Sequence, residues 1–256
     1  MVVDLKRVTL FTIYVPWDKS EIAAEDFQDG EKEKSLDNGL EDTIRSLHTC
    51  MEAAQFGAVK FVTSKKVIEE RGEDLLKDGI VCEEPRIPVK NMKDYARHMI
   101  YHTYEHVDTD FVLTIQHDGF IINPLGWRDE FFDYDYIGAP WPWREQGFVT
   151  PYGEHIAVGN GGFSLRSKKL IELPSKVDVP FDVVAKNDFY KMFGAVNWNE
   201  DGNICVHNRH IFEEHGCKFA PVDVAKYFSH ESPLDINRGI IPFGYHGNLP
   251  AGVTIE

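Results

Sequence analysis

The hydrophobic positions of the chain form short unbroken runs that alternate with longer stretches at helical spacing. Unbroken apolar runs at residues 7–15, 58–63 and 110–116 are typical of strands buried on both faces. Between the first two runs, residues 40–57 carry apolar side chains at helical spacing, and Gly57 suits the position just after a helix. The order strand, helix, strand predicts the start of a parallel α/β sheet.

The second half continues this alternation. Helical spacing at residues 92–107 is followed further along by a glycine-rich turn at 158–162, a strand and the start of a helix. We expect a longer helix over 198–216, and a strand with a short helix over 217–231. The glycine-rich tail from Arg238 is typical of a loop. Because no repeat or interior linker interrupts the pattern, we predict a single α/β domain with a mainly parallel central sheet flanked by helices.

One segment breaks the alternation. Residues 18–38 are acidic and polar, which predicts a variable insert or a flexible loop. The whole chain is 43% hydrophobic over 256 residues, so it can still bury a sizeable core.

Charge limits the classes of partner. The formal net charge is −15, and such a surface would repel a nucleic-acid duplex or an anionic membrane. We therefore expect no nucleic-acid partner. An anionic small ligand would need a local source of positive charge, such as a metal ion, an Arg side chain or a helix N-terminus.

Cysteine usage and hydropathy bear on the compartment. The four cysteines form no Cys-x-x-Cys pair, which predicts reduced thiols rather than a zinc knuckle or a disulfide scaffold. No stretch approaches the roughly 20 apolar residues of a membrane span, and the first residues lack the apolar core of a signal peptide. We expect a cytoplasmic protein, or a soluble domain excised from a larger one.

The sequence Asp118-Gly119 follows the apolar run at 110–116 and has two interpretations. An Asp-Gly pair between apolar runs is a strong signal for a two-residue hairpin turn. In open α/β sheets, however, ligands bind beyond the carboxyl ends of the strands, which is where Asp118 is expected. The carboxylate can start a turn and also point into a ligand site, so both interpretations stay open.

A family resemblance adds to these patterns. The segments "TIQHDGFIINPLGWRDEFFDYDYIGAPWPW", "VGNGGFSLRS", "NEDGNICVHNR" and "CKFAPVDVAKYFSHE", in this order, resemble an uncharacterised family of small domains related to GT-A glycosyltransferases. The resemblance covers about Val8 to Gly247 and is weakest from Asp18 to Asn38. It implies a GT-A-like (Rossmann-like) fold and the transfer of a sugar from a UDP- or GDP-sugar donor to a glycan or other hydroxyl acceptor.

The resemblance also implies a metal site. Gln116-His117-Asp118 stands where GT-A enzymes carry an Asp-x-Asp metal motif, and only the third position is acidic here. Asp118 would bind Mn²⁺ or Mg²⁺, with Gln116 and His117 beside the donor. The metal would act as a Lewis acid on the departing diphosphate. His246 in "GYHG" resembles a third metal ligand, with His230 in "FSHE" as its rival.

Three further residues would contact the donor by the same resemblance. Arg97 occupies the place of a helix Arg that reaches the donor, although without the resemblance a solvated helix face would be the better explanation. Thr12 and Tyr14, at the end of the first strand, would lie near the nucleotide base.

The glycine-rich turn and the acidic pair after it would bind and activate the acceptor. Asn160 could hydrogen-bond a sugar hydroxyl, while Gly161 and Gly162 could offer backbone N–H groups; the ordinary alternative is a simple connecting turn. Asp201 is our candidate for the general base of an inverting transfer, with Glu200 orienting the acceptor. Helix capping explains that pair equally well from local sequence.

The aromatic loop holds a further candidate. Trp141 and Trp143 either pack the loop or stack on an acceptor sugar, and we assign packing to one of them and leave the other open.

Two other functions compete with the glycosyltransferase. The incomplete metal motif favours a non-catalytic domain that binds a carbohydrate or a nucleotide sugar. A nucleotidyltransferase or phosphohydrolase would also place carboxylates at strand ends. It would need a basic phosphate loop or more carboxylates near Asp118, and the sequence has neither.

Overall fold

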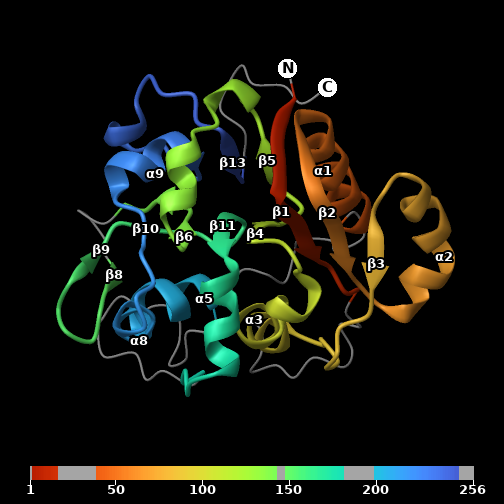
Figure 1. Ribbon diagram of the computed structural model, residues 1–256, viewed down its shortest axis with the longest axis horizontal. Helices are drawn as coiled ribbons and strands as arrows, with labels where there is room; N and C mark the ends of the chain where they lie inside the picture. Colours follow the sequence, from red (N-terminus) through yellow and green to blue (C-terminus); the bar gives the residue numbers. More distant parts are fainter. Residues whose placement is uncertain (1, 17–38, 143–147, 182–198, 248–256) are drawn as a thin grey trace.

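The main sheet is mixed and mostly parallel. The computed structural model describes residues 2–16, 39–142, 148–181 and 199–247. The strands run in the order β3-β2-β1-β4-β11-β6, in which β3, β2, β1 and β4 are mutually parallel and β11 is antiparallel to both of its neighbours (Figure 1). Their bounds are β1 Val3–Ile13, β2 Ala54–Val62, β3 Val81–Glu83, β4 Phe111–Ile115, β6 Tyr136–Ile137 and β11 Phe163–Ser167.

Helices cover both faces of this sheet. In Figure 1, α1 and α2 lie on the right beside β1, β2 and β3, whereas α3, α5 and α8 lie along the lower part of the molecule. The helices are α1 Gly39–Ala53, α2 Lys65–Lys77, α3 Met92–Tyr101, α5 Lys168–Glu172, α7 Glu200–Gly202, α8 Arg209–Glu214 and α9 Val222–Phe228. Single 3₁₀ turns cover Thr103–His106, Pro124–Gly126, Asp129–Asp133, Leu173–Ser175 and Asp235–Asn237.

Alternating side chains of the central strands feed two separate hydrophobic clusters. Leu10 and Leu113 point into a cluster with α1 and α9, while their neighbours Phe11 and Val112 point into a cluster with α3, α5 and α8. Side chains of a strand alternate between its faces, so a strand apolar at every position must be covered on both sides. The unbroken runs in the sequence therefore predicted the central strands correctly, and the expected fold class, a mixed and mainly parallel α/β sheet flanked by helices, is confirmed.

A second, three-stranded sheet joins distant parts of the chain. Its order is β12-β13-β5, with β12 Ser229–His230, β13 Gly244–His246 and β5 Gly119–Ile121. Strand β13 is antiparallel to β5 and sets His246 opposite Gly119. The tail was expected to be a loop, and that expectation is wrong for Gly244–His246. Two smaller pairs complete the sheets: β7 Ala139–Pro140 with β10 Val158–Gly159, and β8 Phe148–Val149 with β9 His155–Ile156.

The predicted end of the first helix is also wrong. Helix α1 ends at Ala53 and Gly57 lies within β2, so Gly57 is not the residue that follows the helix. A Cβ atom at Gly57 would come within 2.2 Å of the Lys6 carbonyl oxygen. This glycine allows β1 and β2 to approach where their register shifts between Leu5 and Thr9.

The helix expected over 198–216 is divided. A short turn, α7, runs into a π-helical turn over Asn203–His207, and α8 follows. The predicted stop at Gly216 is confirmed, because Gly216 has a φ of +77° just beyond the helix. Within the described ranges no helix is long and apolar enough to cross a bilayer. Residues 18–38, predicted to be an insert or a loop, lie outside the described residues.

Candidate functional site

The Gln116–Gly119 turn forms the first part of the candidate site. It follows β4 directly, and the Gly119 backbone N–H donates to the Gln116 carbonyl at 3.0 Å. The chain then enters β5, which pairs with β13 rather than with β4. Asp118 is therefore in a turn, but the turn is not a hairpin between neighbouring strands. The carboxylate lies beyond the carboxyl end of a central parallel strand, as the second interpretation of the sequence required.

Strand β13 brings His246 to this turn. Its Nε2 atom lies 3.2 Å from Asp118 Oδ1 and 3.2 Å from Gln116 Oε1. The Gly247 backbone N–H donates to the Asp118 carbonyl at 3.0 Å, which ties the end of β13 to the turn. The Gln116 amide is held from its other end, because Nε2 donates to the Tyr95 hydroxyl at 2.9 Å.

The other nitrogen of His246 faces different partners. Its Nδ1 atom lies 3.0 Å from Asn160 Nδ2 and 3.5 Å from Glu231 Oε1. The imidazole thus lies between two carboxylates, Asp118 on the Nε2 side and Glu231 on the Nδ1 side. We refer to Gln116, Asp118, Glu231 and His246 as the histidine cluster.

The charges of the histidine cluster shift its pKa values. Burial alone would lower the pKa of His246, but its hydrogen bonds and charge interactions with Asp118 and Glu231 outweigh burial and raise the pKa to about 10. Burial would raise the pKa of both carboxyl groups, yet the same imidazole holds each of them below its ordinary value. At neutral pH the cluster therefore contains an imidazolium between two carboxylates.

The side chains near Asp118 fit a divalent cation through a mixed set of donors. Among the described residues, no three His, Cys, Asp or Glu side chains are arranged to hold a metal ion, since Asp118 and Glu231 face opposite nitrogens of one ring. Asp118 Oδ1 is nevertheless buried with no hydrogen bond beyond its ion pair with His246. It and Gln116 Oε1 lie at the separation from His246 Nε2 expected of adjacent ligands, because metal–oxygen distances of about 2.1 Å set neighbouring donors about 3 Å apart.

The Asn160–Gly162 loop lies against the histidine cluster. Asn160 has a φ of +80°, a conformation that Asn tolerates better than most residues. Its Oδ1 atom accepts the Phe163 backbone N–H at 3.0 Å, and its Nδ2 atom faces His246. Both ends of the amide are therefore engaged within the protein. A hydrogen bond from Asn160 to a sugar hydroxyl would have to replace or share one of these contacts.

The two glycines of the loop contact protein side chains. A Cβ atom at Gly161 would lie 1.9 Å from Glu200 Oε1, and one at Gly162 would lie 2.0 Å from His246 Nε2. The Gly161 backbone N–H donates to Asp201 Oδ2 at 3.1 Å, so it is not available to a ligand as the sequence had suggested. The absence of side chains at both glycines is required for this packing.

Asp201 contacts the loop at Gly161, whereas His246 contacts it at Asn160 and Gly162; we call these two sets of contacts the flanks of the loop. Its Oδ2 atom accepts the Gly161 N–H, and its Oδ1 atom accepts the Gly202 N–H at 2.7 Å. Burial, together with the negative charges of Glu200 and Glu231, raises the pKa of Asp201 to about 7. A carboxyl group with this pKa exchanges its proton readily near neutral pH. The π-helical turn that begins at Asn203 follows immediately, and such turns occur frequently at functional sites.

Glu200 has a different environment from its neighbour. It is 4% exposed, and its Oε1 atom lies 3.3 Å from Nη2 of Arg166, which is fully buried on β11. The Arg166 guanidinium also donates through Nε to Ser164 at 3.1 Å and lies 5.3 Å from the centre of the Tyr136 ring. This buried ion pair packs against the loop at Gly161. The predicted contact of Glu200 with an acceptor would require this carboxylate to leave Arg166.

Several predicted donor residues lie outside these contacts. Thr12 is 1% exposed and its hydroxyl donates to the Ile115 carbonyl at 2.8 Å, so it is enclosed between β1 and β4. Arg97 lies over the Phe181 ring at 4.8 Å. Tyr14 lies just beyond β1 and packs against Gly39 at the start of α1. Trp141 is 5% exposed and covers Gly159, which supports packing for this tryptophan.

Three candidates remain, and the structure describes two of them. His117 is largely exposed, with Nδ1 3.8 Å from Asp118 Oδ1. His230 is buried and its Nε2 atom lies 2.7 Å from the Lys226 carbonyl, so His246, not its rival, lies beside Asp118. Trp143 lies outside the described residues.

Sequence reasoning missed three residues that shape the site. Glu231 was missed although it ends the quoted segment "CKFAPVDVAKYFSHE", because only His230 beside it was considered as a ligand. Tyr95 was predicted only as part of a helix face. Arg166 left a visible signal, since an arginine within an otherwise apolar or small-residue strand implies a buried partner.

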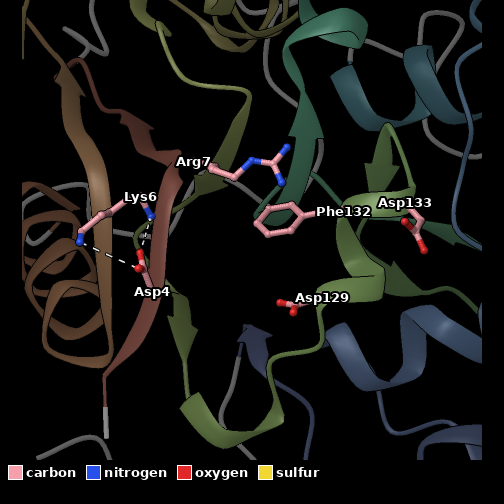
Figure 2. Close-up of a pocket in the computed structure, with 6 residues that line it drawn as sticks. All are labelled: Asp4, Lys6, Arg7, Asp129, Phe132 and Asp133. Atoms are coloured by element: carbon pink, nitrogen blue, oxygen red, sulfur yellow. Dashed lines mark hydrogen bonds and ion pairs between the residues drawn. The ribbon is translucent and has the colours of Figure 1, made fainter.

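A separate hollow of about 610 Å³ lies at the other end of the sheet. Figure 2 shows the residues that line it, Asp4, Lys6 and Arg7 from β1 and Asp129, Phe132 and Asp133 from the 3₁₀ turn, with the Lys6 side chain directed away from that turn. These β1 residues precede Val8, where β4 begins to pair, whereas Asp118 lies past the last residue of β4. Arg7 is already engaged by Asp110 at 2.8 Å and lies over the Phe132 ring. The hollow is therefore distinct from the candidate site.

Solved structures with similarity to this chain include transferases of two kinds. Mouse xyloside xylosyltransferase 1 in its apo form is 12% identical, with a TM-score of 0.47 over 99% of this chain and 100% of that one. The apo-form glycosyltransferase GlyE of Streptococcus pneumoniae is 12% identical, with a TM-score of 0.42 over 94% of this chain and 54% of that one. The inositol-1-phosphate CTP transferase from T. maritima is 11% identical, with a TM-score of 0.41 over 83% of each chain.

Sequence comparison gives the family. No curated protein matches the chain. A family model described as "Protein of unknown function (DUF5672)" matches residues 81–246, which include β4, the Asn160–Gly162 loop, the acidic pair and β13. The chain therefore belongs to this family.

Proposed function

We propose that this protein is a glycosyltransferase that moves a sugar from a nucleotide-sugar donor to a hydroxyl group of a glycan or similar acceptor, with metal assistance and inversion. One observation carries the proposal. Asp118 and Asp201, which are 83 positions apart in the sequence, flank the same three-residue loop, Asn160–Gly162. One carboxylate is thereby available for a cation, and the other for a proton.

The donor side of the proposal uses Asp118, Gln116 and His246. These residues would hold Mn²⁺ or Mg²⁺, which when bound would act as a Lewis acid and stabilise the negative charge of the leaving diphosphate. His246 must present an unprotonated Nε2 atom for this role. A protein with a net charge of −15 needs such a local site to bind a nucleotide diphosphate.

The acceptor side uses Asp201. Its carboxylate would take the proton of the acceptor hydroxyl as that oxygen forms a bond to the anomeric carbon and the bond from this carbon to the diphosphate oxygen breaks. A pKa of about 7 suits this exchange, because a base is most effective when its pKa lies near the working pH. The buried Arg166–Glu200 pair would hold the start of α7, and with it Asp201, against the loop.

A thermal-shift assay tests the donor side. We expect a UDP- or GDP-sugar to raise the melting temperature in the presence of Mn²⁺, because ligand binding to the folded state stabilises it. Asp118→Ala should abolish the metal-dependent part of this shift. Asp129→Ala, an aspartate at the other end of the sheet, is the matched control and should keep the shift. An unchanged shift in the Asp118 variant would remove this residue from the metal site.

Turnover tests the acceptor side. Asp201→Asn should leave donor binding intact and reduce the release of nucleotide diphosphate in the presence of a glycan panel by about 10²–10⁴-fold, the usual contribution of a general base. Full turnover in this variant would assign the base to another residue.

A second candidate is a non-catalytic domain that binds a nucleotide sugar or a glycan. The ion pairs of His246 with Asp118 and Glu231 favour it, because they occupy the carboxylate that a metal would use. Stabilisation by free glycans alone, unaffected by Mn²⁺, would support this candidate over the transferase.

A further inference from the structure

Glu231 contacts the ring nitrogen of His246 that faces away from Asp118. It is only partly exposed, and its Oε1 atom lies 3.5 Å from His246 Nδ1. It follows β12, which is parallel to β13 and places His230 opposite Tyr245. Two adjacent strands of the small sheet thus supply the imidazole and the carboxylate, so their relative positions are fixed by backbone pairing.

The position of the proton on a neutral His246 depends on the groups at both ring nitrogens. Two acceptors, the Asp118 carboxylate and Gln116 Oε1, face Nε2 and favour a proton there when no cation is bound. Asn160 Oδ1 accepts the Phe163 N–H, so the amide is oriented with its Nδ2 donor toward His246 Nδ1. A neutral imidazole carries one proton, and a donor at Nδ1 favours the form with that proton on Nε2. In that form Nε2 cannot bind a cation. Glu231 opposes this preference, because a carboxylate is an acceptor and favours the proton on Nδ1.

We propose that Glu231 is a positioning residue: it holds the remaining proton of His246 on Nδ1 and so directs the Nε2 lone pair toward Asp118 and Gln116, where a divalent cation binds. Metal-binding histidines generally donate their other ring N–H to a carboxylate, carbonyl or water in this way. Its role in catalysis rests on the proposed function. When a cation takes the place of the Nε2 proton, the proton that remains on Nδ1 depends on the contacts around that nitrogen.

The neighbouring groups leave Glu231 as the acceptor on this side. The described side chains near His246 Nδ1 are the Asn160 amide, which presents its donor end, and Glu231. Asp118 and Gln116 face the opposite nitrogen. Gly162 packs against the ring with no side chain of its own. Removing the carboxylate at 231 therefore leaves a donor but no acceptor at Nδ1.

The test is the binding of Mn²⁺ alone, measured by titration calorimetry on the full chain. We expect Glu231→Gln to weaken Mn²⁺ binding by about 10–100-fold, the usual effect of losing such a partner. Glu130→Gln is the matched control, since it makes the same charge change on the distant 3₁₀ turn and should leave binding unchanged. Melting temperatures of all variants show whether the fold is intact.

A rescue variant separates proton placement from general damage to the structure. In Asn160→Asp combined with Glu231→Gln, a carboxylate again faces Nδ1, and Asp tolerates the positive φ at position 160. We expect this double variant to recover most of the lost affinity. A purely structural role of Glu231 predicts a second loss instead.

Electron spin-echo spectroscopy of bound Mn²⁺ gives a readout apart from affinity and turnover. We expect imidazole nitrogen coupling in the unchanged protein and in the double variant, and its loss or weakening in Glu231→Gln. Unchanged affinity and coupling in Glu231→Gln would overturn the proposal. Failure of the unchanged protein to bind Mn²⁺ would overturn the metal-assisted function. Histidine ¹⁵N spectra above the pKa of His246 would then compare the unchanged protein with Glu231→Gln, and an Nε2–H fraction that does not increase in the variant would overturn the assignment of Glu231.

Discussion

The two flanks of the Asn160–Gly162 loop each place a carboxylate beside a cation, but the two cations differ in kind. On one flank, Glu200 pairs with the guanidinium of Arg166, which stays charged at every accessible pH. On the other flank, Asp118 pairs with an imidazole that can give up a proton. The first pair is therefore permanent, whereas the second can release its carboxylate to a competing cation. Similar contacts in a structure can thus serve stability on one side and exchange on the other.

The largest expected effect in this comparison is the loss of stability when the Glu200–Arg166 pair is broken. Glu200→Gln should lower the free energy of unfolding by about 3–5 kcal/mol, because it leaves the buried Arg166 charge without a counter-charge. Urea unfolding at pH 7.5 measures this change. Asp118→Asn, on the exchangeable flank, should cost much less, since His246 can become neutral. Equal losses in the two variants would contradict the distinction between the flanks.

The two glycines between the flanks provide a matched pair of smaller perturbations. Gly161→Ala forces its Cβ into Glu200 and should lower the free energy of unfolding by about 1–3 kcal/mol, as overpacking does. Gly162→Ala forces its Cβ into the His246 ring, so we expect it mainly to weaken Mn²⁺ binding. Unfolding and Mn²⁺ titration on both variants give a two-by-two comparison. If each variant lowered the free energy of unfolding and the Mn²⁺ affinity to the same extent, the two glycines could not be assigned to separate flanks.

The smallest effect concerns the pH dependence contributed by Asp201. Its pKa of about 7 in the folded protein exceeds the value of about 3.9 expected in the unfolded chain, so the folded state keeps this proton to higher pH. The resulting stabilisation is fully present below about pH 4 and is lost as the pH rises through 7. Asp201→Asn cannot lose a proton, and we expect its melting temperature to exceed that of the unchanged protein by about 2–4 °C more at pH 8.5 than at pH 6.5. A difference independent of pH would contradict the raised pKa.

The central sheet could be predicted because its signal is local. The runs that form β1, β2 and β4 are apolar at successive positions, and burial on both faces requires this pattern. The end of α1 could not be predicted in the same way. Gly57 looked like a helix stop, but its role is a close approach to the Lys6 carbonyl of another strand, which only the tertiary structure reveals.

The candidate site was predictable in its residues more than in their contacts. Asp118, Asn160, Asp201 and His246 were all singled out in the sequence, and the structure brings them around one loop. The engagement of both ends of the Asn160 amide was not predictable, because one of its partners, His246, comes from a distant segment. Glu231 was missed for the same reason, since nothing near it in sequence indicates its contact with His246.

The pairing of β13 with β5 has a consequence for when the histidine cluster is completed during synthesis. Strand β5 leaves the ribosome early, but its partner ends at His246, more than 120 residues later. The sheet can form most of its parallel core before then, yet the histidine cluster stays incomplete until the last strand docks. A slip of one residue in that pairing would turn His246 to the other face of the small sheet. Correct assembly of the core therefore does not ensure that the histidine cluster forms, because the cluster also requires Gly244–His246 to dock in the right register.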